Sequence, residues 1–186
     1  MQTLGLSDST PRIENRLKSL LWPSIQSGTD VDYLGTQGYW VCAIVAVVSF
    51  GILVAAGQPI VAVVTLLFYY VGGVGVRERS RFAAVLVFVF YVMDMLISLR
   101  IGVISIIITA LLLSNLRATW IASSWKPDSE EAAMPPRLGE TWVDKFADQW
   151  PAWFWPKVRV IYYIFSICLL LLVGLGLVVM AFRRVQ

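Results

Sequence analysis

The stretch YWVCAIVAVVSFGILVAAG, residues 39–57, decides the fold class because it holds no charged residue over the length of a membrane-crossing helix. A helix needs about 20 apolar residues to cross the hydrocarbon core of a bilayer. Inside lipid the backbone must satisfy its own hydrogen bonds, so only helices and closed barrels cross. Strands of a barrel alternate between polar and apolar residues. This stretch does not alternate, and it therefore predicts a transmembrane α-helix.

Apolar stretches of similar length recur along the rest of the chain. The whole set covers roughly residues 39–56, 59–75, 82–99, 101–121 and 158–182. The composition agrees, since 58% of the residues are hydrophobic and 15% are charged, against about 25% charged in soluble domains. We predict an all-α integral membrane protein, a bundle of about five transmembrane helices with two interfacial amphipathic helices.

Helix-breaking or basic segments separate these stretches. Gly57-Gln58-Pro59 ends the first, because proline cannot continue the helical hydrogen-bond ladder. The basic segment 77–81 separates the second from the third, and Arg100 followed by Gly102 separates the third from the fourth. This last break is weak, so residues 82–121 can also be interpreted as one bent hairpin with little loop.

The positions of lysine and arginine predict the orientation in the membrane, because cytoplasmic loops carry an excess of both. With the N-terminus inside, 12 of the 15 basic residues fall on the cytoplasmic side. The outer side then holds Arg100, Arg183 and Arg184. We therefore predict a cytoplasmic N-terminus and an outer C-terminus. The first thirty residues hold no long apolar stretch, so we expect the first span, rather than a cleaved signal peptide, to direct insertion.

Two amphipathic segments are predicted to lie on the membrane surface. The first, TPRIENRLKSLLWP at residues 10–23, is predicted to form a basic helix at about 11–22 on the membrane. The alternative is that this helix packs on a soluble partner or on the protein itself. The second, TWVDKFADQWPAWFWPK at 141–157, is aromatic, with ligand binding as the alternative. Tryptophan prefers the membrane–water boundary. The predicted interfacial anchors are Trp22, Trp142, Trp150, Trp153 and Trp155.

These features divide the chain into four segments. Residues 1–36 form a cytoplasmic N-terminal segment, and 37–122 form a four-span membrane core. Residues 123–157 form a cytoplasmic loop that carries the aromatic helix, and 158–186 form the fifth transmembrane helix with the C-terminal tail. No internal repeat or low-complexity segment complicates this division.

Asp94 is the only acidic residue inside a predicted span. A charge at the bilayer centre costs about 2.5–3.5 kcal/mol on insertion scales, which makes such a residue a functional candidate. Tyr91 and Ser98 lie on the same helical face, whereas Arg100 can pair with Asp94 only if the chain bends back or a second subunit supplies it. Two interpretations follow, a proton or cation site near the outer surface and a structural contact between helices. We favour the structural contact.

The chain offers few residues for catalysis or metal binding. It has no histidine, which excludes Ser-His-Asp triads, His-ligated zinc and the usual His-ligated haems. Cys42 and Cys168 lie in apolar stretches, and we interpret both as small buried hydrophobic residues. We predict no cofactor, no metal and no catalytic residue. A net charge of +3 does not suggest nucleic-acid binding.

The segment GGVGVRER, residues 72–79, has glycines like those of a phosphate-binding loop but lacks the Gly-Lys-Ser/Thr ending and the preceding strand. We interpret it as a glycine-rich helix end. The basic residues that follow can contact anionic lipid headgroups. These predicted headgroup contacts are Arg77, Arg79 and Arg81.

The function expected from the sequence is that of a non-enzymatic multi-pass membrane protein. Its partners are the lipid bilayer and either other membrane subunits or itself, because stripes of small residues let helices approach closely in lipid. We therefore expect an accessory or scaffolding subunit, or a self-associating bundle. The alternatives are a small oligomeric channel or transporter that uses Asp94, and a membrane-bound enzyme.

Overall fold

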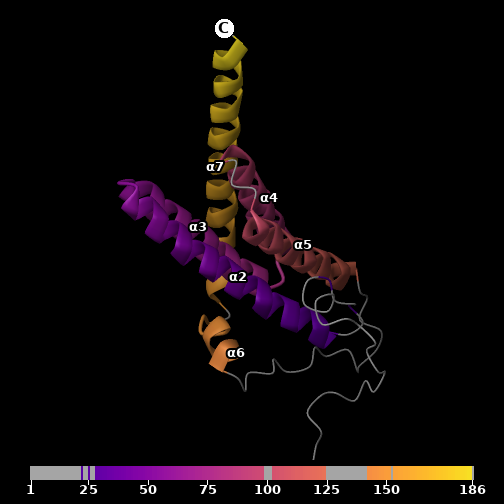
Figure 1. The fold of residues 1–186 in the computed structure, drawn as a ribbon. Coiled ribbons are helices and arrows are strands. Elements are labelled where there is room, and N and C mark those ends of the chain that lie inside the picture. The colour runs from indigo at the N-terminus through magenta and orange to yellow at the C-terminus, as the bar shows by residue number, and fades with distance from the viewer. Residues whose placement is uncertain are drawn as a thin grey trace, which may run out of the picture.

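The computed structural model describes residues 22, 25, 28–98, 102–124, 142–151 and 153–185, and within them all regular structure is helical. This confirms the all-α prediction. Figure 1 shows the helices and their labels. In chain order they are α2 (Gly28–Ala55), α3 (Pro59–Arg77), α4 (Arg81–Ile97), α5 (Val103–Ser124), α6 (Trp142–Ala147) and α7 (Phe154–Val185).

Four of these helices are long and apolar enough to cross a membrane. Their apolar segments are Val31–Ala55 of α2, Pro59–Arg77 of α3, Val103–Ile121 of α5 and Phe154–Gly176 of α7. The composition of these helices indicates membrane association. Helix α4 has 17 residues, at the lower end of the crossing range of about 17 to 25. The span predicted at residues 82–99, and with it the total of five spans, therefore stays a prediction.

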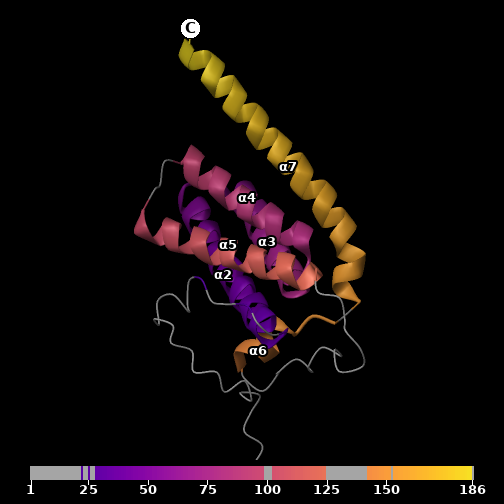
Figure 2. The ribbon, with the colours of Figure 1, turned by 90° about the vertical axis from the view of Figure 1, so that its right-hand side faces the viewer.

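Two helical hairpins form the body of the molecule. Helices α2 and α3 make the most extensive pairing, α4 and α5 pack together, and α2 also contacts α5. Helix α6 lies against one end of α2, while α7 touches α3 and α4. Figures 1 and 2 show that the C-terminal half of α7 extends beyond the other helices. Thus α7 joins the bundle mainly through its N-terminal half.

The break predicted at residues 57–59 forms the α2–α3 turn. Gly57 adopts a positive φ of 75°. The N–H of Gly57 donates to the Val54 carbonyl at 3.0 Å, and the N–H of Gln58 donates to the Leu53 carbonyl at 2.9 Å. This pattern closes a helix with a left-handed residue after its last turn, a position where glycine carries no steric cost. Pro59 then begins α3.

The α3–α4 turn also has a left-handed residue after the last turn of the helix, but this residue is not a glycine. Arg79 has a φ of 56°, and the N–H of Ser80 donates to the Gly75 carbonyl at 2.9 Å. The Ser80 hydroxyl also accepts the N–H of Ala83 at 3.3 Å. Ser80 therefore completes the end of one helix and caps the start of the next.

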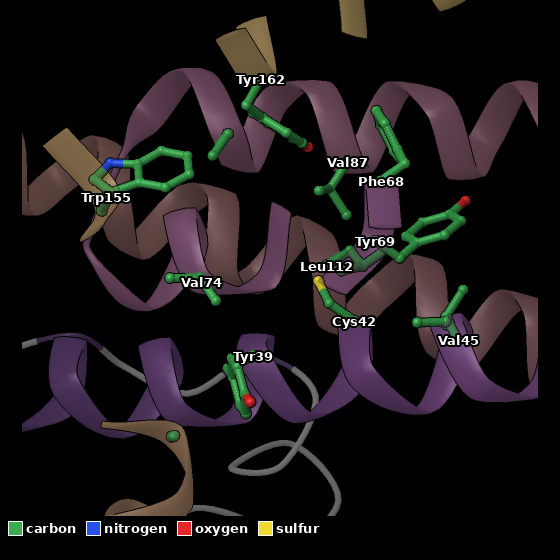
Figure 3. Packing of buried hydrophobic residues seen from close by; sticks show 13 residues of the cluster. Tyr39, Cys42, Val45, Phe68, Tyr69, Val74, Val87, Leu112, Trp155 and Tyr162 are labelled. Atoms are coloured by element: carbon green, nitrogen blue, oxygen red, sulfur yellow. The ribbon is translucent and has the colours of Figure 1, made fainter. Parts of the chain in front are cut away.

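Glycines on α3 let side chains of α2 and α7 approach its backbone closely. A Cβ atom at Gly73 would lie 2.9 Å from the Cβ of Cys42 on α2. At Gly72 it would meet the Tyr162 hydroxyl of α7 at 2.5 Å, and at Gly75 it would overlap the Trp155 ring. Figure 3 shows Trp155 and Tyr162 entering the buried cluster from the side opposite to Tyr39 of α2. The glycine-rich segment is therefore a packing surface, and α3 continues through it to Arg77.

Helix α2 begins at Gly28, well before the predicted start at residue 39, so the predicted segment junction at residue 36 falls inside a helix. The added turns form because Val31 and Leu34 are buried, each with 1% exposure. Their apolar contacts outweigh the poor helix propensity of the glycines and threonines around them.

One of the two cysteine predictions is wrong. Cys42 is buried, as expected, but Cys168 is exposed on α7. The buried side of α7 carries Tyr162 and Ser166. Cys168 is two residues beyond Ser166, which turns its side chain about 200° away around the helix. An apolar stretch does not reveal which of its faces a neighbouring helix covers.

Substituting Gly75 with alanine is expected to destabilise the protein. The new methyl group would lie 2.7 Å from the Cβ of Ala83 and overlap Trp155, and such overpacking costs about 1–3 kcal/mol. Gly51→Ala is the matched control because, among the described residues, no atom of another helix lies within 4 Å of its Cβ position. There the better helix propensity should raise stability by up to about 1 kcal/mol. Thermal unfolding in detergent micelles, followed by tryptophan fluorescence, measures both. Equal effects would contradict the close packing at Gly75.

Candidate functional site

The most distinctive polar group is a buried arginine, Arg77, that is bound by two carboxylates, those of Asp32 and Asp148. We call these three residues the arginine clasp. Arg77 is the last residue of α3, and its side chain has 2% exposure. Its Nη1 donates to Oδ1 of Asp32 on α2 at 2.9 Å and to the Asp32 carbonyl at 3.0 Å. Its Nε and Nη2 donate to the two carboxylate oxygens of Asp148, each at 2.8 Å. The guanidinium is thus bound on both sides.

The clasp joins parts of the chain that are far apart in sequence. Asp32 precedes Arg77 by 45 residues, and Asp148 follows it by 71. Asp148 lies in the turn directly after α6, where its N–H donates to the carbonyl of Asp144 at 2.9 Å. A bidentate pair of this geometry fixes direction as well as distance. The clasp therefore holds α6 against the α2–α3 hairpin.

Further contacts hold α6 in the same place. The Thr36 hydroxyl donates to Asp144 at 3.3 Å. The Trp40 indole N–H donates to the Val143 carbonyl at 3.3 Å, and its ring stacks on Phe146 at 5.7 Å. These residues lie one helical turn apart on α2, so α6 follows the surface of that helix.

The connection from α6 to α7 is anchored as well. The Tyr70 hydroxyl accepts bonds from Gln149 Nε2 at 3.0 Å and from Trp150 Nε1 at 3.2 Å. The ring of Trp150 stacks on Phe154 at 4.3 Å. The N-terminal part of α7 is therefore fixed to α3.

We call the end of the molecule that contains the clasp the arginine end. It consists of α6, the first turns of α2, α4 and α7, and the last turns of α3 and α5.

The three predicted headgroup arginines occupy different environments. Arg77 lies inside the protein in the clasp and not on its surface. Arg79 is 21% exposed and donates to Asp32 at 3.2 Å. Arg81 is exposed, with its guanidinium carbon 5.9 Å from the centre of the Trp120 ring. Headgroup contact stays a prediction for Arg79 and Arg81.

The predicted tryptophan anchors also separate into two groups. Trp142, Trp153 and Trp22 are exposed, by 89%, 59% and 41%. Trp155 is instead a core residue with 7% exposure, because the missing side chain of Gly75 leaves room for its ring. Trp150 is half-buried against Tyr70. The predicted helix at residues 11–22 lies outside the described residues, apart from Trp22.

Asp94 lies in the last turn of α4, at the end of the bundle opposite the arginine end, and its side chain is exposed. Tyr91 is half-buried and Ser98 is exposed. The Ser98 hydroxyl donates to the backbone carbonyl of Asp94 at 2.6 Å, not to its carboxylate. Arg100 lies outside the described residues. Whether Asp94 forms a proton site or a structural contact stays a prediction.

Sequence reasoning missed the two carboxylates of the clasp. Asp32 lies before the first predicted span, and Asp148 lies within the predicted aromatic segment at 141–157, where no role was predicted for it. The signal was the position of Arg77 directly after GGVGV, since a helix that packs this tightly buries its last turn. A buried guanidinium needs carboxylate partners.

The arrangement of the clasp suits mechanical connection between helices. Within the described residues no group of three His, Cys, Asp or Glu side chains could hold a metal ion. The clasp carboxylates are both occupied by Arg77. Breaking a buried pair from one side leaves an uncompensated charge and costs about 3–5 kcal/mol. The clasp can therefore hold α6 and α7 firmly to the hairpins.

Replacing Arg77 with glutamine is expected to cost about 3–5 kcal/mol of unfolding free energy, because two carboxylates lose their shared partner. Arg79→Gln is the control, since a partly exposed ion pair contributes less than about 1 kcal/mol. Denaturant unfolding in mixed micelles measures both. In the double variant Arg77→Gln/Asp148→Asn the loss should be smaller than the sum of the single losses. Equal losses for Arg77→Gln and Arg79→Gln would disprove the special role of Arg77.

Comparisons with known proteins give no relative from which a role could be transferred. No protein-family model, no curated protein and no solved structure matches this chain. The interpretation of the clasp and of the surfaces around it therefore rests on their own contacts.

Proposed function

We propose that this chain is a non-enzymatic accessory or scaffolding subunit that presents α7 to another membrane-embedded polypeptide. The observation that carries the proposal is how little of α7 its own chain covers. In an 18-residue apolar stretch of α7, 11% of the residues are buried, against 28% to 44% in the corresponding stretches of the other three candidate spans. The clasp supports this role because it fixes the N-terminal end of α7 and leaves the rest of the helix accessible.

The exposed side of α7 is apolar from Val160 to Leu175. Leu171 and Leu172 are 68% and 67% exposed, and Leu175 is 65% exposed. Lipid alone can cover such residues, since acyl chains are as apolar as leucine. A second feature on the same helix therefore has to distinguish a protein partner from lipid.

The glycines of α7 provide this second feature. No atom of the described chain lies within 4 Å of a Cβ built at Gly174 or Gly176. On α3, by contrast, Gly72, Gly73 and Gly75 each admit a neighbouring side chain at short range. Glycine in a helix interior lowers the stability of the helix by about 1 kcal/mol relative to alanine. Two glycines without a neighbour on α7 favour close approach by a helix from another polypeptide.

Site-specific photo-crosslinking from Leu172 is expected to capture a second polypeptide in native membranes. Val48 on α2, which is 54% exposed, is the matched control and should give lipid adducts only. The mass of the adduct separates a second copy of this chain from a different subunit. Lipid adducts alone from both positions would contradict the proposal.

Filling the glycine surface should weaken the same contact. Gly174→Ile is expected to lower the yield of the Leu172 crosslink severalfold, because a branched side chain separates the two helix backbones. Gly51→Ile on α2, where the Cβ position is also open, should leave the yield unchanged. An unchanged yield in Gly174→Ile would remove the glycines from the interface.

The proposed orientation places the arginine end in the cytoplasm and the C-terminal end of α7 outside. Two exposed positions test it, Trp142 and Phe182, which are 89% and 70% exposed. In a Cys168→Ser background, a membrane-impermeant maleimide should label Phe182→Cys in intact cells. It should label Trp142→Cys only after permeabilisation. Labelling of both positions in intact cells would overturn the orientation.

A further inference from the structure

Three basic residues of the arginine end lie over tryptophan rings. The guanidinium carbon of Arg81 on α4 lies 5.9 Å from the Trp120 ring of α5. That of Arg117 on α5 lies 4.9 Å from Trp22, and the Lys157 ammonium on α7 lies 4.9 Å from Trp153. We call these three pairs the cation–tryptophan rim. A cation that lies over the face of an indole is attracted by the ring.

The carboxylates of the clasp do not neutralise the cations of the rim. Asp32 and Asp148 both bind the buried Arg77. Within the described part of the chain, neither Arg81 nor Lys157 forms an ion pair. Arg159, two residues beyond Lys157, is exposed as well. The rim therefore attracts anions.

Apolar side chains directly beside the cations restrict what kind of anion fits. Phe82, which follows Arg81, is 71% exposed. Val160 and Ile161 lie one helical turn after Lys157 and are 56% and 69% exposed. A ligand that covers both kinds of surface carries a negative headgroup and hydrocarbon chains.

We propose that the cation–tryptophan rim binds anionic phospholipids. The headgroup phosphate meets Arg81, Arg117 and Lys157, while the acyl chains lie along the apolar residues that follow on α4 and α7. The tryptophan rings sit at the level where indoles prefer to lie, between headgroup and hydrocarbon. The stems of the basic residues cover apolar surface and their charged ends reach the phosphate. This inference is independent of the partner proposed for α7.

Native mass spectrometry of the full chain in mild detergent tests the rim, with dioleoyl phosphatidylglycerol and dioleoyl phosphatidylcholine as probes. Phosphatidylglycerol should bind more tightly, and raising the salt concentration should weaken it. Removing each basic residue should weaken binding about fivefold, so Arg81→Gln/Arg117→Gln/Lys157→Gln should lose about 100-fold. The matched control is Arg183→Gln/Arg184→Gln at the other end of α7, which should bind as the parent does.

Further measurements distinguish the loss of charge from a loss of folding, and a lipid ligand from free phosphate. Arg81→Lys/Arg117→Lys keeps the charge and should retain most of the affinity, and thermal unfolding should show that each variant is folded. Glycerol 3-phosphate, which lacks acyl chains, should not compete. Equal binding of both lipids, an unchanged affinity in the triple variant, or full competition by glycerol 3-phosphate would each overturn the proposal.

Discussion

A guanidinium enclosed between two carboxylates, away from water, is the contact on which the rest of this structure depends. Arg77 ends the central helix α3, and its partners belong to α2 and to the turn after α6. Attraction between charges grows as water is excluded, and an arginine without its carboxylates would be costly there. The clasp therefore specifies one position for α6, and with it the point from which α7 starts.

The glycine surface of α3 makes the clasp possible. Because Gly72, Gly73 and Gly75 have no side chains, α2 and α7 come close enough to cover the last turn of α3. Trp155 fills the space beside Gly75 and closes one side of that turn. Packing and electrostatics thus support one another: the glycines bury Arg77, and Arg77 holds the elements that surround it.

The molecule differs strongly between its two ends. At the arginine end, ion pairs, hydrogen bonds and stacked aromatic rings join α2, α3, α6 and α7. Toward the other end, α7 leaves the bundle and its apolar side chains are exposed (Figures 1 and 2). One end is therefore built for fixed internal contacts and an aromatic–basic surface, and the other leaves a helix accessible to its surroundings. This asymmetry underlies both proposals.

The sequence by itself determined the helical class, the approximate position of the long helices and the turn at Gly57, because apolar length and glycine–proline signals act locally. It did not reveal the first turns of α2, the core position of Trp155 or the exposure of Cys168. Nor did it reveal that Arg77 binds Asp32 and Asp148, 45 and 71 residues away. Only the tertiary structure decided these, because which face of a helix is buried, and which charges meet, depends on neighbours distant in sequence.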